Sequence, residues 1–129
     1  EWYAFLNGRV FFWTTQERLF RLMGAAAYRN QRHCVLELDT RSLFFDCASQ
    51  ITFSPINSGA TFVAGPVRGP HTFSPIDSFP YGIYRQKGRK ANDIFVELTV
   101  NYGVCNVVKH VKTVHIMQNN SIIERIHPN

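Results

Sequence analysis

The pattern of hydrophobic and polar positions predicts a chain with more strands than helices. β-Branched and aromatic residues gather in short runs, and turn-forming residues separate these runs, as is typical of strands. The predicted strands are Arg9–Trp13, His33–Leu38, a short extended segment at Gln50–Phe53, Ile94–Val100, and a terminal hairpin of His110–Met117 and Ser121–Ile126. Asn119 and Asn120 lie inside this hairpin, and asparagine tolerates the positive φ of a tight turn.

A helical period occurs near the start of the chain. Thr14 and Glu17 have the spacing of a capping box, in which each side chain accepts a hydrogen bond from the other residue's backbone N–H. Apolar residues then recur at helical spacing and form one face, namely Leu19, Leu22, Met23, Ala26 and Ala27. The pattern as a whole predicts an α+β fold that is rich in strands, with one main helix near the N-terminus.

The stretch from Ser54 to Gly88 is rich in Pro, Gly and Ser, which favours loop and edge strand over regular structure. It also contains an echo, because TFSPINS at 52–58 returns as TFSPIDS at 72–78. Two copies are too few for a repeat fold. We interpret them as chance or as two similar exits from a strand into a loop.

Composition narrows the class of protein. The chain has 129 residues, 45% of them hydrophobic, with 14 Lys and Arg against 9 Asp and Glu, which gives a net charge of +5. This length and apolar content predict a single domain, and no apolar run approaches the roughly 18 residues of a membrane span. The three cysteines show no CxxC spacing, so we expect no metal site and a reducing cytoplasm. The aromatic segment that follows Glu1 indicates a fragment whose upstream part is absent.

Glu97 is the first candidate for chemistry. In the predicted strand Ile94–Val100, alternation places Glu97 with Phe95 and Thr99 on one face. A carboxylate there is either a solvated strand residue or a functional group that borders a cleft. The residue pattern leaves both interpretations open.

A basic segment precedes that strand. Its four cations, Arg85, Lys87, Arg89 and Lys90, could attract phosphates or could form a solvated loop. The nearby aromatic residues Phe79, Tyr81 and Tyr84 could stack on bases.

A third set of candidates lies near the predicted helix. Arg9 and Trp13 share a strand face, and Arg18 lies in the first turns of the helix, where its dipole favours an anion. Asn57, in the Asn-Ser-Gly segment, and Arg68 are further candidates that equally fit a turn and a surface position.

The chain resembles a known family in two segments. GRKANDIFVELTV, a Gly-Val turn and VVKHVKTVHIM resemble the C-terminal part of DarT-type ADP-ribosyltransferases, in which a basic loop leads into a strand with the catalytic Glu. LNGRVFFWTTQERLFRLM resembles the strand-to-helix segment of that fold that helps to hold NAD. The motifs LNxRVFFW, LDT, INSG and RGxxTF also resemble an uncharacterised bacterial family.

The resemblance implies an ADP-ribosyltransferase-like fold of split sheets that uses NAD as a substrate. Glu97 would be the catalytic residue, because it matches the Glu that binds the nicotinamide-ribose hydroxyl and stabilises an oxocarbenium-like centre. Arg18 is the nearest match to the arginine expected at the NAD phosphates, although its offset differs. The loop from Arg68 to Lys90 would recognise the substrate, and its charge suits a nucleic acid. The family's upstream strand has no counterpart here and would lie before Glu1.

Three hypotheses about function follow. The first is an ADP-ribosyltransferase that modifies nucleic acid or protein. The second is a non-catalytic nucleic-acid-binding module that depends on the basic segment. The third is a partner-binding domain in which Trp2, Tyr3 and Phe5 dock on a missing segment or on another protein.

Overall fold

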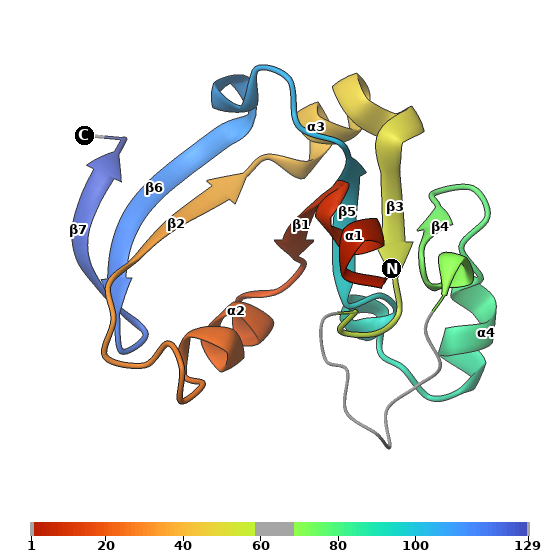
Figure 1. The fold of residues 1–129 in the computed structure, drawn as a ribbon, viewed down its shortest axis with the longest axis horizontal. Helices are drawn as coiled ribbons and strands as arrows, with labels where there is room; N and C mark the ends of the chain where they lie inside the picture. Colours follow the sequence, from red (N-terminus) through yellow and green to blue (C-terminus); the bar gives the residue numbers. More distant parts are fainter. Residues whose placement is uncertain (1, 59–68, 129) are drawn as a thin grey trace. The chain divides into compact units, whose positions relative to one another are not determined.

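The computed structural model describes residues 2–58 and 69–128 and contains two antiparallel sheets (Figure 1). The chain forms two compact units, which we call unit 1 (residues 1–14 and 47–104) and unit 2 (residues 15–46 and 105–129). The ranges interleave, so the chain passes from one unit to the other three times. Helices and two antiparallel sheets confirm the α+β class, whereas the single domain stays a prediction.

The sheet of unit 1 has the strand order β1-β5-β3-β4. Its strands are β1 (Arg9–Trp13), β3 (Ile51–Ser54), β4 (Ser74–Pro75) and β5 (Glu97–Asn101). The bounds of β1 are those predicted, and the two copies of the echo are antiparallel neighbours, with Phe53 opposite Ser74. The central strand β5 begins at Glu97, three residues later than predicted, because a 3-10 turn at Ala91–Asp93 and a bend precede it.

The register of this sheet defines two faces, because directly opposed residues of antiparallel strands point to the same side. Trp13, Glu97 and Ser54 are opposed across β1, β5 and β3. We call this side the Glu97 face. The side chains on it are Arg9, Phe11, Trp13, Thr52, Ser54, Glu97, Thr99 and Asn101.

The opposite side, which we call the Phe53 face, carries the aromatic core of unit 1. Phe95 stacks on Phe53 with ring centroids 4.0 Å apart, so Phe95 lies on this side. The prediction that Phe95 shares a face with Glu97 is therefore wrong, because the strand alternation starts only at Glu97. Phe79 packs against both rings.

Two helices of unit 1 were not expected from the sequence. They are α1 (Trp2–Asn7) and α4 (Tyr81–Gln86). The Pro-rich stretch holds the predicted edge strand as β4, but it also holds α4 and a 3-10 turn at Pro70–Thr72.

The sheet of unit 2 has the order β2-β6-β7. Its strands are β2 (His33–Leu38), β6 (Val111–Gln118) and β7 (Ser121–His127). The predicted bounds of β2 are confirmed, and those of the hairpin shift by about one residue. Asn119 and Asn120 have positive φ of 52° and 61°, as the tight turn requires.

Unit 2 contains α2 (Gln16–Met23) and most of α3 (Thr40–Cys47). The predicted cap residue of α2 is wrong by one position, because Thr15, and not Thr14, accepts the hydrogen bond from Arg18 N. Thr14 Oγ1 instead donates to the carbonyl oxygens of Phe95 and Val96 in unit 1. The prediction of a single main helix is also an underestimate, because α3 is as long as α2, with eight residues each.

None of the helices in the part of the chain that the structure describes has the length and apolar character needed to cross a membrane.

Candidate functional site

Glu97 lies at the first position of the central strand of unit 1 and is only 5% exposed. The side chain of Trp13 on β1 and that of Ser54 on β3 flank it on the same face. A buried carboxylate is costly unless hydrogen bonds compensate for lost water. Burial therefore removes the interpretation of Glu97 as a solvated strand residue.

A short loop after β3 supplies a hydrogen bond to this carboxylate. The backbone N–H of Ser58 donates to Glu97 Oε1 at 3.1 Å, and Ser58 is 1% exposed. Ser54 fixes the start of the loop, because Ser54 Oγ accepts from Ile56 N at 3.2 Å and donates to Ile56 O at 2.9 Å. Residues 55–58 thus fold back over the start of β5.

An aromatic group lies over the Glu97 face. The rings of Trp2 and Phe5 on α1 stack with centroids 5.5 Å apart, and Phe73 packs against both. Phe11 from the sheet contacts Phe73 edge-on. Trp2 and Phe5 therefore pack on residues of their own unit, whereas Tyr3 is exposed. Docking of these three residues on a missing segment stays a prediction.

Arg9 is held within this aromatic group. Its guanidinium carbon lies 4.2 Å from the centre of the Phe5 ring and 4.5 Å from that of Phe73, an arrangement that gives cation–π attraction. Burial lowers the pKa of Arg9 below its ordinary value. Arg9 shares the Glu97 face but lies at its other end, opposite Asn101.

The basic segment divides into two kinds of residue. Arg89 is structural, because its Nη1 donates to Pro55 O at 2.8 Å and to Ile94 O at 3.2 Å, and its guanidinium lies over the Tyr84 ring. Arg85, Lys87 and Lys90 are exposed.

The aromatic residues near this segment differ in burial. Phe79 is buried, and its ring packs on those of Tyr81 and Tyr84. For Phe79 the expectation of stacking on bases is wrong, because this ring belongs to the core of unit 1. Tyr81 and Tyr84 are half-buried, and stacking of their rings on bases stays a prediction.

The remaining predicted residues fall in three places. Asn57 is exposed and directly precedes Ser58. Arg18 lies in the first turn of α2, which belongs to unit 2, whereas Glu97 belongs to unit 1. Arg68 lies outside the described residues.

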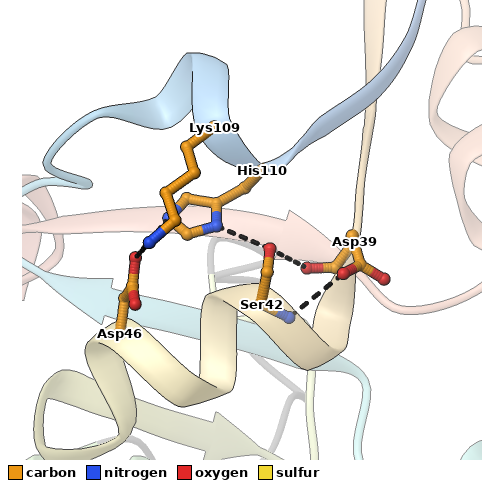
Figure 2. Close-up of polar contacts among 5 residues, drawn as sticks. All are labelled: Asp39, Ser42, Asp46, Lys109 and His110. Atoms are coloured by element: carbon orange, nitrogen blue, oxygen red, sulfur yellow. Dashed lines mark hydrogen bonds and ion pairs between the residues drawn. The ribbon is translucent and has the colours of Figure 1, made fainter.

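Unit 2 holds a second polar cluster around His110, which is fully buried (Figure 2). Ser42 Oγ lies 2.7 Å from His110 Nδ1, and Asp46 Oδ2 lies 3.5 Å from His110 Nε2. Lys109 Nζ forms an ion pair with the same Asp46 oxygen at 2.8 Å. The hydrogen bond from Lys109 is the main cause of a lowered pKa at Asp46.

These residues contain a serine, a histidine and an aspartate, but their arrangement is structural. The backbone N–H of Ser42 donates to Asp39 Oδ2, and the backbone N–H of Leu43 donates to the carbonyl oxygen of Asp39. Because both N–H groups are engaged in these bonds, neither is available to stabilise an oxyanion. Asp39 N in turn donates to His110 O at 2.7 Å. We call this cluster the His110 clasp, because it joins the start of α3 to the segment before β6.

Sequence reasoning named Trp2 and the segment that contains Ser58, but it missed the hydrogen bonds that join them to each other and to Glu97, and it missed the His110 clasp. One available signal was Asp39 three residues before Ser42, which is the spacing of a helix cap. Leu43 and Cys47 follow at i and i+4, and both are buried. The contacts of Trp2 and Ser58 had no local signal, because the two residues are 56 positions apart.

Together, the fold and the buried carboxylate define an α+β protein that carries a polar site on the central strand of an antiparallel sheet. Residues 1–111 match the model of the family of unknown function DUF7002, and the chain belongs to this family. Both Glu97 and the His110 clasp lie within the matched residues. Neither the curated proteins nor the solved structures give a match to this chain.

Proposed function

We propose that this protein is an ADP-ribosyltransferase that consumes NAD, with Glu97 as its catalytic carboxylate. The observation that carries the proposal is the buried position of Glu97, with its Oε1 oriented by the Ser58 N–H and with Trp13 beside it. Buried carboxylates with a fixed orientation are typical of functional sites. The resemblance of residues 88–100 to the strand that carries the catalytic Glu supports the same conclusion.

The chemistry requires a negative charge close to the reacting ribose. The bond between the ribose C1′ and the nicotinamide nitrogen breaks, and its electron pair leaves with nicotinamide. The oxocarbenium-like centre at C1′ is then attacked by an acceptor lone pair, and the acceptor loses its proton to solvent. Glu97 stabilises the positive charge that develops in this transition state, and water exclusion strengthens the effect.

The residues near Glu97 fit NAD as a substrate. Trp13 offers an aromatic ring next to the carboxylate, and Asn57 offers an exposed amide one residue from Ser58. Arg9, on the same face of the sheet, is the proposed partner of the phosphates, since arginine binds phosphate oxygens in a bidentate manner. The same role for Arg18, which belongs to unit 2, stays a prediction from the sequence.

The proposed acceptor is a nucleic acid. Arg85, Lys87 and Lys90 are exposed and close together in sequence, so they can contact phosphates without ordering a further segment. The burial of Phe79 indicates contacts to the phosphate backbone rather than stacking on bases. A cytoplasmic location is part of this proposal.

A non-catalytic module that binds nucleic acid or a partner is the second candidate, and the same three exposed cations favour it. Such a module would bind with strong salt dependence, and charge reversal at Arg85, Lys87 and Lys90 would weaken binding. Its binding would not require Glu97. Loss of function in a Glu97 variant that still binds nucleic acid therefore separates the two candidates.

The test is NAD consumption and label transfer with DNA, RNA and protein acceptors. We expect Glu97→Gln to lower NAD turnover by about 10²-fold or more, because it removes the charge that stabilises the transition state. Glu124→Gln is the matched control, since Glu124 is an exposed strand glutamate of unit 2. The proposal fails if the wild-type protein transfers no label and consumes no NAD, or if Glu97→Gln is as active as the wild type.

A further inference from the structure

We propose that Trp2 is a positioning residue that holds the Glu97 carboxylate in place through Ser58. This inference rests on the proposed function, because it assigns Trp2 a part in the reaction that Glu97 would catalyse. It links the N-terminal helix α1 to the central strand β5 through one peptide segment.

Two hydrogen bonds of equal length make the link. Trp2 Nε1 donates to Ser58 O at 3.1 Å, and Ser58 N donates to Glu97 Oε1 at 3.1 Å. The two bonds involve the peptide groups on either side of the Ser58 Cα. By holding the carbonyl, the indole restrains the position of the Ser58 Cα, and the N–H that meets the carboxylate is only one bond away from this atom.

The rest of the loop is held by other residues. Arg89 Nη1 binds Pro55 O, and Ser54 Oγ binds both polar backbone groups of Ile56. These contacts, from the last residue of β3 and from the segment that follows α4, hold Pro55 and Ile56 in place. Trp2 fixes the end of the loop, where the N–H that meets Glu97 is found.

The indole is itself fixed by stacking. The Trp2 ring lies on the rings of Phe5 and Phe73, with interplanar angles of 21° and 19°. These contacts set the direction of the indole N–H. A phenylalanine at this position would keep the stacked ring and lose only the donor, so packing and positioning can be separated by experiment.

The experiment compares Trp2→Phe with the wild type in NAD turnover. We expect kcat to fall about tenfold while KM for NAD changes less than about twofold, because the carboxylate is misplaced in the transition state and the NAD contacts remain. Ala4→Ser, at an exposed position on the same helix, is the control that should leave both parameters unchanged. Trp2→Leu, which loses the stacking too, should be less stable and no more active than Trp2→Phe.

An NMR measurement tests the link without reference to activity. The chain has two tryptophans, so two indole N–H signals are expected, and Trp2→Phe identifies the one from Trp2. We expect Glu97→Gln to shift the Ser58 amide and the Trp2 indole signals, and Trp2→Phe to shift the Ser58 amide.

The two measurements separate the failure of this inference from that of the proposed function. If Glu97→Gln abolishes turnover but Trp2→Phe changes neither kcat nor the Ser58 amide, the inference is overturned and the proposed function stands. If the wild type consumes no NAD, the proposed function fails, and the coupled shifts alone would still support Trp2 as the residue that positions this carboxylate. Absence of those shifts would overturn the inference in either case.

Discussion

Removal of one hydroxyl from the His110 clasp should destabilise unit 2 by a measurable amount. In Ser42→Ala, the imidazole of His110 loses the oxygen that lies 2.7 Å from Nδ1, and the fully buried ring has no access to water as a replacement. A buried polar group left without its partner costs about 1–3 kcal/mol. Ser42→Thr keeps the hydroxyl and is the matched control, for which we expect a loss below about 0.5 kcal/mol.

The size of the thermal shift depends on how much of the chain unfolds together. With an unfolding entropy of about 2.1 cal/mol/K per residue, a loss of 2 kcal/mol corresponds to a decrease in Tm of about 7 °C if all 129 residues unfold together. If unit 2 unfolds alone, with about 57 residues, the same loss corresponds to about 17 °C.

Two optical probes distinguish these cases. Trp2 and Trp13 both belong to unit 1, so tryptophan fluorescence reports on unit 1, whereas circular dichroism reports on both units. If Ser42→Ala moves both transitions equally, the two units unfold as one. The reasoning is refuted if the free energy of unfolding falls by less than about 0.5 kcal/mol in Ser42→Ala. It is also refuted if Ser42→Thr loses as much unfolding free energy as Ser42→Ala, because the hydroxyl would then not be what stabilises the clasp.

Two further predictions concern titrating groups. The hydrogen bond from Lys109 lowers the pKa of Asp46, so this pair stabilises the folded state above the ordinary carboxyl pKa of about 4 and loses its effect as pH falls through the lowered value. Lys109→Gln should therefore be less stable than the wild type at pH 7, and the difference should vanish in acid denaturation series; a difference that persists at low pH would contradict this. Burial, and then the charge of Asp77, raise the pKa of Tyr81, whose hydroxyl donates to Ile76 O at 2.7 Å. The stability from this group is complete below the ordinary tyrosine pKa of about 10 and is lost as pH rises through the raised value. Tyr81→Phe should therefore remove, from a spectrophotometric titration, a tyrosine that ionises above the ordinary value.

The sequence predicted best those elements whose pattern is set by neighbours in the chain. The strands Arg9–Trp13 and His33–Leu38 have the predicted bounds. For the first strand the reason is local, because a run of β-branched and aromatic residues after a turn pair favours a strand. Helix α1 went unpredicted because Trp2, Tyr3 and Phe5 favour strands by propensity. Its formation depends on packing of Trp2 and Phe5 on Phe73, a contact that spans about 70 positions.

The echo shows why two identical short segments of a sequence can adopt different structures. Phe53 and Phe73 stand in the same context, TFSPI, yet Phe53 packs with Phe79 and Phe95 while Phe73 packs with Trp2 and Phe5. Phe53 is inside a strand with neighbours on both sides, whereas Phe73 precedes the short edge strand β4. Tertiary contacts, which no local pattern encodes, decide the difference. The same holds for Glu97: alternation identified its strand, but only the loop that returns through Ser58 buries it.

The interleaved ranges of the two units have a consequence for how the chain is made. In each sheet the central strand is synthesised after at least one of the strands that pair with it. β1 and β3 precede β5 in the chain, and β2 precedes β6. While the ribosome is still translating residues 54–96, the run Val10-Phe11-Phe12 has no strand to pair with. Unpaired hydrophobic strands of this kind favour aggregation and chaperone binding. Neither sheet can therefore be completed on a nascent chain until most of the polypeptide has emerged.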